Sequence, residues 1–333
     1  MNTSGIPDLL ANSRLIRQSG QISADLTRAA GEVTSGRVAD PIAASGGNPA
    51  RLYAIERDIA LLETRTQQIE IAGQRAALTQ AALAQVQQAG NGIGTNLIGA
   101  VGRGDTASAE RIASSARSGF EQAVEALNTR FGSRTLFSGA EVEGAALASS
   151  DDILTDILAL ANGAATGGAA LAAVRDYFAP GGGFETTGYL GSTNDAPSAE
   201  LSPGVRVDYA IRADDENLRA MLEGLAIGVV AAEGTLTGDG QLFLFRETGE
   251  RVIAATDRVV DVRATLGVAE ERIETANIRT SAERTFLNEA RNAIISRDPF
   301  EAAAELTGIE TQLATLFSVT ARLSQLNLSS FLR

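Results

Sequence analysis

Apolar residues recur at alternating intervals of three and four along two long stretches of the chain. In the second stretch, every seventh position from Val252 to Ile294 is apolar except Thr280, and small residues such as Ala255 and Ala269 stand three positions later. This is the spacing of a coiled-coil seam, and it lasts for about six heptads. It predicts one continuous helix of about 65 Å, because each residue adds about 1.5 Å. Such a seam needs a partner helix close alongside.

The first stretch supplies that partner. From Leu52 to Gln87 the same spacing recurs for about five heptads, so the two predicted helices match in length. Both far exceed the mean of about 11 residues for helices in globular proteins, which argues against ordinary amphipathic core helices. A third helix is predicted to start after the N-cap residue Asp105 and to run to Phe131.

Both ends of the chain add a further helix. An apolar stripe starts at Leu15, is interrupted by Gly20 and ends at Ser35-Gly36, so this helix is marginal by itself. The second helix opens at Asp298-Pro299, where Asp298 is the expected N-cap and Glu301 is expected to complete a reciprocal cap.

The apolar surface of the last helix exceeds what the first helix can cover. We therefore expect the surplus to be buried against other copies of the chain or other proteins. The predicted interface consists of Leu15, Ile22, Leu26, Leu306, Ile309, Leu313, Leu316, Phe317, Leu323, Leu326 and Phe331.

The glycine-rich middle of the chain has a different pattern. Short helices are predicted at 152–161, 169–178 and 216–232, and strand-like alternation at 205–211 and 241–246. The acidic groups Asp151-Asp152 and Asp214 to Glu216 stand where helices are expected to begin, where the helix dipole favours them, so we expect no metal site.

The predicted fold is therefore mainly α. It is an elongated antiparallel helical bundle or coiled-coil rod formed by the N- and C-terminal halves, with a small α+β insertion in the middle. The expected domains are a terminal-helix domain (1–38 with 299–333), a helical rod (39–139 with 251–298) and a variable insertion (140–250).

The residue inventory argues against an enzyme. The chain has no His, no Cys and no Lys, so all 28 basic residues are Arg. The usual ligands of zinc, haem and iron–sulfur clusters, a thiol nucleophile and a base that titrates near neutrality are therefore missing, and we expect no cofactor. A formal charge of −13 disfavours nucleic-acid binding. No run of about 18 apolar residues indicates a membrane span, and no cleavable secretory signal is recognisable.

Three motifs resemble the flagellin superfamily. Ser35, Gly36 and Arg37 followed by Asp40 and Pro41 look like the family's Ser-Gly-basic turn ahead of an Asp-Pro step, although residues 42–48 replace the family's tighter acidic cluster. Phe131 to Gly139 resembles its Arg-x-Leu-Phe-(Ser/Gly)-Gly element, and the ending from Val319 to Leu328 is similar to the end of junction proteins. The residues of the second motif are Arg134, Leu136, Phe137, Ser138 and Gly139.

The resemblance covers roughly residues 10–140 and 250–333 and implies a function. It implies a structural subunit that is exported without cleavage through the flagellar type III apparatus and polymerises outside the cell, at the junction of hook and filament. The implied partners are other copies of the chain, axial proteins such as hook-associated protein 1 and flagellin, and a cytoplasmic export chaperone.

Three alternatives stay open. A filament flagellin would also assemble through apolar terminal helices. Its copy number along the filament distinguishes it from a junction protein. A secreted coiled-coil adhesin would still bind its target without its terminal helices. An enzyme housed in residues 140–250 would need a site, and the sequence indicates none.

Overall fold

The computed structural model describes residues 5–46, 48–141 and 143–331, and describes side chains for 13–46, 48–141 and 143–322. Helices dominate this part of the chain. They are α1 (Gly5–Ser35), α2 (Pro41–Ala44), α3 (Ala50–Gly90), α4 (Ile93–Gly102), α5 (Thr106–Leu127), α6 (Ser150–Ala161), α7 (Gly167–Phe178), the π-helical turn η1 (Phe184–Gly188), α8 (Glu216–Glu233), α9 (Asp239–Ile295) and α10 (Pro299–Phe331). The strands are β1 (Arg130–Phe131), β2 (Arg134–Thr135), β3 (Ala199–Ser202) and β4 (Val205–Val207).

The chain packs as two compact units. The first comprises Met1–Glu63 with Ser281–Arg333, and the second comprises Thr64–Thr280. The first unit therefore joins the two ends of the chain, whereas the second is one continuous stretch. The predicted mainly helical fold with a small strand-containing insertion is confirmed. No helix in the described part of the chain is both long and apolar enough to cross a membrane.

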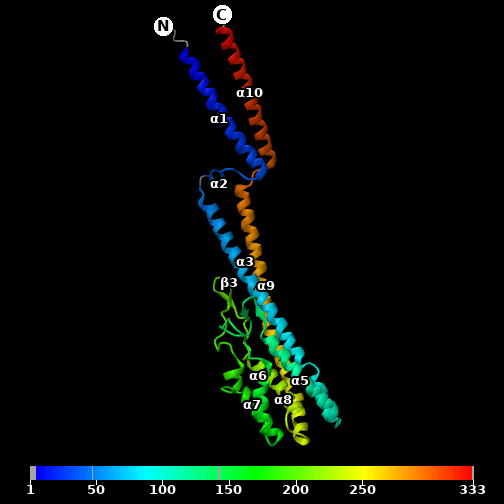
Figure 1. Cartoon of the computed structure of the whole chain (residues 1–333). Coiled ribbons are helices and arrows are strands. Elements are labelled where there is room, and N and C mark those ends of the chain that lie inside the picture. The colour runs from blue at the N-terminus through cyan, green and yellow to red at the C-terminus, as the bar shows by residue number, and fades with distance from the viewer. Residues whose placement is uncertain (1–4, 47, 142, 332–333) are drawn as a thin grey trace. The chain divides into compact units, whose positions relative to one another are not determined.

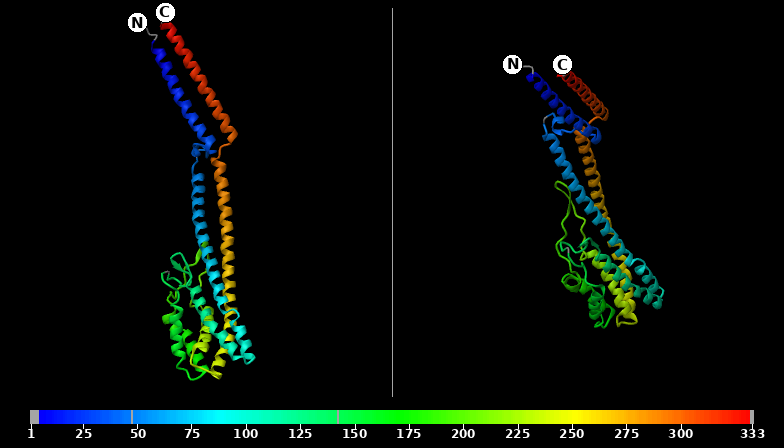
Figure 2. Two further views of the ribbon diagram at one scale, coloured as in Figure 1. Left: turned by 45° about the vertical axis from the view of Figure 1, so that its right-hand side comes forward. Right: turned by 45° about the horizontal axis from the view of Figure 1, so that its top comes forward.

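In the first unit, α1 and α10 run side by side (Figures 1 and 2). Ala29 of α1 and Ala302, Ile309 and Leu316 of α10 are buried. Small Ala side chains bring the two helix backbones close near the start of α10, and larger side chains fill the space further along. The pairing of the two terminal helices follows from their apolar stripes, as predicted.

In the second unit, α3 and α9 pack along the predicted seam. Leu83 and Val86 of α3 are fully buried in the same apolar cluster as Val252 and Val259 of α9. The two helices are in close contact at Gly73, where an added Cβ atom would lie 3.5 Å from Ile273. At Gly73 the seam packs a glycine of α3 against a branched side chain of α9, and further along it packs larger apolar residues of both helices.

The structure corrects the prediction of a strand at 241–246. This segment is the beginning of α9, in which Leu244 and Phe245 are fully buried and the Gln241 amide Nε2 donates to the Ala231 carbonyl at 3.0 Å. A short apolar run fits a buried helix as well as a strand, because periodicity alone does not separate the two. Segment 241–246 is helical because it runs directly into the long helical seam of α9.

Two further boundaries differ from the prediction. α5 ends at Leu127 and not at Phe131, because the Asn128 side chain exchanges hydrogen bonds with the backbone of Leu147 at 2.8 and 3.1 Å. Phe131 then lies in the β1–β2 hairpin. The strand predicted at 205–211 is confirmed only for β4, which pairs antiparallel with β3. The three predicted helices of the insertion are confirmed as α6, α7 and α8.

Candidate assembly sites

A backbone link joins the turn after α1 to the segment that leads into α10. Gly36 adopts φ +65°, which a glycine accepts without strain. Its carbonyl accepts the amide of Arg297 at 3.0 Å, and the amide of Val38 donates to the carbonyl of Ile295 at 2.9 Å. The Ser35-Gly36-Arg37 motif therefore fixes where the last helix begins relative to the first.

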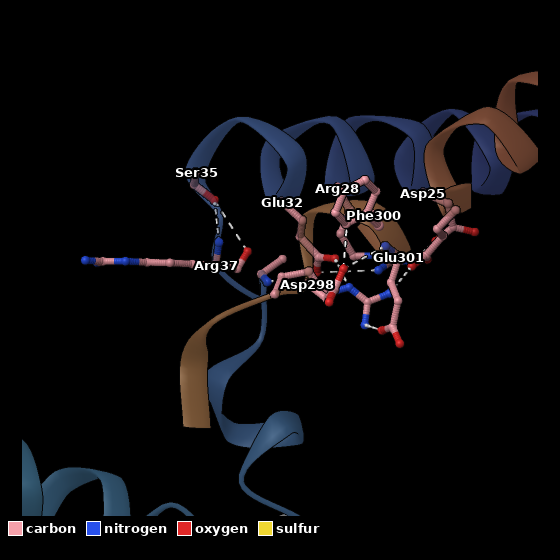
Figure 3. Close-up of polar contacts among 11 residues, drawn as sticks. Asp25, Arg28, Glu32, Ser35, Arg37, Asp298, Phe300 and Glu301 are labelled. Atoms are coloured by element: carbon pink, nitrogen blue, oxygen red, sulfur yellow. Dashed lines mark hydrogen bonds and ion pairs between the residues drawn. The ribbon is translucent and has the colours of Figure 1, made fainter. Parts of the chain in front are cut away.

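Four charged side chains close a ring beside this link. Arg28 lies 3.6 Å from Glu32 (Figure 3) and 3.2 Å from Glu305. Arg297 lies 3.6 Å from Glu32 and 2.6 Å from Glu305. Each arginine thus contacts both carboxylates. Hydrogen bonding to Glu305 raises the pKa of Arg28. The ring joins two residues of α1 to Glu305 of α10 and Arg297 just ahead of it.

Glu32 is the buried member of this ring. It is only 7% exposed, and its carboxylate also accepts the amide of Ala39 at 2.9 Å. A buried carboxylate is stable only when charges and donors surround it, and here all of them come from the ring and the turn. Glu32 therefore connects α1, the turn and the start of α10.

Asp40 and Asp298 both cap helices, and Asp298 was predicted to do so. Asp40 accepts the amides of Ile42 and Ala43, both at 3.0 Å, at the start of α2. Asp298 accepts the amides of Phe300 and Glu301 at 2.8 and 3.2 Å. The reciprocal cap by Glu301 is not present, because its carboxylate lies 3.7 Å from the guanidinium of Arg297 instead.

The described residues of the predicted interface differ in their exposure: some are buried between α1 and α10, and others face solvent. Ile309 and Leu316 are buried, whereas Phe317 is 57% exposed. The half-buried residues are Leu15, Ile22, Leu26, Leu306 and Leu313. Leu323, Leu326 and Phe331 lie outside the residues whose side chains are described. The helix pair therefore covers one apolar side and leaves other apolar side chains in solvent.

The exposed apolar residues were not all found from the sequence. Ile16 is 65% exposed and Phe300 is 86% exposed. Phe300 stands in the first turn of α10, within the cap that the sequence analysis identified. The exposure of Phe300 could not be predicted from the spacing of apolar residues, because it depends on which side of α10 faces α1.

Residues 134–139 form a packing element within the second unit. Phe137 is fully buried, and its carbonyl accepts the amide of Ala213 at 2.9 Å. The carbonyl of Ser138 accepts the amide of Ser192 at 2.9 Å. Arg134 is exposed on the hairpin and Leu136 is half-buried. The motif thus anchors the loops of the insertion to the end of β2.

Gly139 shows why this motif ends in glycine. Its φ is +66°, and a Cβ atom would lie 2.5 Å from the carbonyl oxygen of Asn194 and 2.6 Å from that of Ser192. A side chain here would meet two backbone atoms, which cannot move as a flexible side chain would. Close backbone approach, besides the turn itself, therefore requires glycine.

The acidic groups serve as helix starts. Asp215 is the N-cap of α8 and accepts the amide of Asn217 at 2.9 Å. Asp151 and Asp152 stand in the first turn of α6, where Asp152 accepts a hydrogen bond from the Ser149 hydroxyl at 2.6 Å. Within the described residues, no group of three or more His, Cys, Asp or Glu side chains could hold a metal ion.

The comparisons with known proteins agree with this architecture. Residues 250–332 match the family described as the bacterial flagellin C-terminal helical region. No curated protein matches the chain. The match covers most of α9 and α10, the helices that carry the second seam and the C-terminal stripe.

Two solved structures resemble the chain. A Vibrio parahaemolyticus protein assigned as a flagellar hook-associated protein superposes with a TM-score of 0.53 at 12% identity, over 77% of this chain and 98% of that one. Bacillus cereus FlgL superposes with a TM-score of 0.52 at 16% identity, over 72% of this chain and 100% of FlgL. The family match agrees with the expectation of a structural protein. Residues 250–332 are therefore similar to the bacterial flagellin C-terminal helical region, and the chain shares its fold with these two proteins.

Proposed function

We propose that this chain is a structural subunit of the bacterial flagellum, of the hook-associated protein 3 type, which assembles at the junction of hook and filament. The observation that carries the proposal is the flagellin C-terminal match at 250–332, together with a terminal helix pair that leaves Phe300 and Phe317 in solvent. Large exposed aromatic side chains are costly in a free protein and valuable at the centre of an interface.

In this proposal the terminal helices, residues 1–38 and 299–333, make the contacts between subunits. Each copy presents the same patches to its neighbours, and heterologous contacts of this kind build a tube or ring. Residues 39–139 with 251–298 form the rod, and residues 140–250 form the variable part. Neighbouring subunits then stabilise the terminal helices by mass action.

The proposal also accounts for how the chain reaches its place. A chain without cysteine needs no disulfide to fold after export. The apolar terminal helices need cover before export, which a cytoplasmic chaperone would supply. Hook-associated protein 1 and flagellin are the expected neighbours on the two sides of the junction.

A filament flagellin is the second candidate, because the family match is to a flagellin region. The two candidates differ in position and copy number. A strain that lacks the junction protein should keep its hooks and release monomeric flagellin into the medium. A strain that lacks its major flagellin should retain the junction proteins on the hooks.

The experiment therefore combines deletion with labelling. Electron microscopy of the deletion strain should show bare hooks, and gold-labelled antibody in the parent strain should mark one short zone beyond the hook. Labelling along the whole filament would favour the flagellin alternative. Normal filaments in the deletion strain, with no label on any flagellum, would reject both candidates.

A further inference from the structure

The turn between α3 and α4 consists of Asn91 and Gly92. Asn91 is exposed, and its carboxamide forms one hydrogen bond among the described residues, in which Nδ2 donates to Gln88 Oε1 at 3.4 Å. The backbone amide of Gly92 donates no hydrogen bond within the described part of the chain. The carboxamide and the backbone nitrogen that follows it are therefore both available to react with each other.

An Asn-Gly pair of this kind can close a ring. The Gly92 nitrogen attacks Cγ of Asn91, so that a bond forms between these two atoms and the bond from Cγ to Nδ2 breaks. The amide proton of Gly92 leaves with Nδ2 as ammonia, and a five-membered succinimide remains. Water then opens one of the two ring carbonyls and yields aspartate or isoaspartate. Glycine leaves the attacking nitrogen unhindered because it has no side chain, and the reacting atoms are held close by the chain itself.

The sequence contains a second Asn-Gly pair, Asn162-Gly163, at the end of α6. Asn162 is also exposed, but its Oδ1 accepts the amide of Thr235, in the connection between α8 and α9, at 3.1 Å. This hydrogen bond ties the carboxamide to a distant segment. Ring closure moves the carboxamide toward the nitrogen of Gly163, so the contact with Thr235 must be lost first. At the ordinary strength of a hydrogen bond, this requirement slows the reaction about fivefold.

Close packing on both sides of the Asn91-Gly92 turn makes the second unit sensitive to this chemistry. A Cβ atom on Gly90 would lie 2.9 Å from Sδ of Met221 in α8, and one on Gly94 would lie 2.8 Å from the carbonyl oxygen of Gly249 in α9. Isoaspartate adds a methylene group to the main chain between these two contacts. The packing leaves little space to absorb it, so conversion of Asn91 should destabilise the second unit.

We propose that Asn91 is a site of spontaneous modification, at which the folded chain converts asparagine into aspartate and isoaspartate, and that Asn162 is protected by its hydrogen bond to Thr235. Both products carry a negative charge that asparagine lacks, and isoaspartate also lengthens the main chain. The reaction consumes only water, so it does not depend on the proposed role in assembly.

The test is incubation of the folded full chain in mildly alkaline buffer, followed by peptide mass spectrometry and by enzymatic methylation of isoaspartate. The peptide that contains Asn91 should acquire the acid forms about fivefold faster, or more, than the peptide that contains Asn162. In concentrated guanidinium chloride the two rates should become similar, because unfolding removes the hydrogen bond between Asn162 and Thr235.

Asn91→Gln is the matched control, because glutamine is also a neutral carboxamide but its longer side chain does not form a five-membered ring. The variant should lose the conversion at this turn and keep the parent rate at Asn162. After incubation, the melting temperature of the parent chain should decrease more than that of the variant. The proposal is overturned if Asn162 reacts as fast as Asn91 in the folded chain, if Asn91 stays intact there, or if incubation lowers both melting temperatures equally.

Discussion

Glu32 of α1 lies 3.6 Å from the guanidinium of Arg297, the residue two positions ahead of α10. The contact joins the ends of two helices that stand at opposite ends of the sequence. It belongs to a ring in which Arg28 and Glu305 complete the charge balance. The ring explains why the turn at Gly36 and the cap at Asp298 lie together, and its removal should loosen the terminal helix pair.

Glu32→Ala should destabilise the first unit by about 1–3 kcal/mol, because it leaves two arginines and the amide of Ala39 without their shared carboxylate. Chemical denaturation followed by circular dichroism measures the change. The matched control is Asp25→Ala, whose side chain is 54% exposed and contacts Arg28 at 3.4 Å. That variant should differ from the parent by about 0.5 kcal/mol or less. Equal losses of stability in the two variants would show that the buried Glu32 stabilises the first unit no more than the exposed Asp25 does.

Gly139→Ala and Gly132→Ala separate close packing from backbone conformation. Both glycines have positive φ, +66° and +62°. A Cβ atom at Gly132 meets nothing within 4 Å, so the variant should lose about 1 kcal/mol from the left-handed conformation alone. At Gly139 the clash with two carbonyl oxygens should raise the loss to about 3 kcal/mol or more. Thermal unfolding of both variants measures these losses. Similar decreases in melting temperature for the two variants would contradict the role of the clash at Gly139.

Glu233→Gln should produce a stability difference that depends on pH. The carboxylate of Glu233 receives two hydrogen bonds of 2.7 Å from Arg117, which lower its pKa from the usual 4.5. A group with a lowered pKa stabilises the folded state above its unfolded value and loses this contribution as the pH falls through the folded value. Because about a third of each side chain is exposed, we expect about 0.5–1 kcal/mol at pH 7.

Urea denaturation of the Glu233→Gln variant and its parent, from pH 7 down to about pH 3, should show the two stabilities converging below the usual carboxyl pKa. Glu121→Gln is the control, since Glu121 lies 3.8 Å from the same arginine. Its effect at pH 7 should be smaller. A difference that persists unchanged at acid pH would mean that the ionised pair is not its source.

Leu316 and Phe317 are neighbours in α10 with opposite expected roles. Leu316 is 9% exposed, so Leu316→Ala should weaken the helix pair by about 2–3 kcal/mol. Phe317 is 57% exposed, so Phe317→Ala should leave the stability of the free chain within about 0.5 kcal/mol. It should nevertheless weaken self-assembly about tenfold or more, measured by sedimentation. If Phe317→Ala assembles like the parent chain, Phe317 is not an interface residue.

Local patterns in the sequence predicted much of the fold. The caps at Asp105 and Asp298 occupy their expected positions, because an N-cap depends only on its own side chain and the next few amides. The end of α5 at Leu127 was missed, since it depends on a hydrogen bond from Asn128 to Leu147 in a different segment. Segment 241–246 was missed because its apolar run carried no helical period of its own.

The candidate sites divide in the same way. The motifs around Gly36 and Gly139 were found by their resemblance to the flagellin superfamily, and the positive φ of both glycines explains why glycine stands there. The ring at Glu32 was not found, because two of its four ion pairs join residues more than 250 positions apart. Only the Arg28–Glu32 pair, four residues apart on one helix, could have suggested it.

The central claim is that the terminal helices are incomplete in a free subunit and find their cover in neighbouring ones. Hydrogen exchange, measured by mass spectrometry on the free chain and on the assembled flagellar structure, tests it most directly. In the free chain, exchange should be fast at 13–35 and 300–322 and slow at 52–87 and 252–294. In the assembly the terminal segments should become protected as well. Terminal segments already fully protected in the free chain, with no further change on assembly, would contradict the claim.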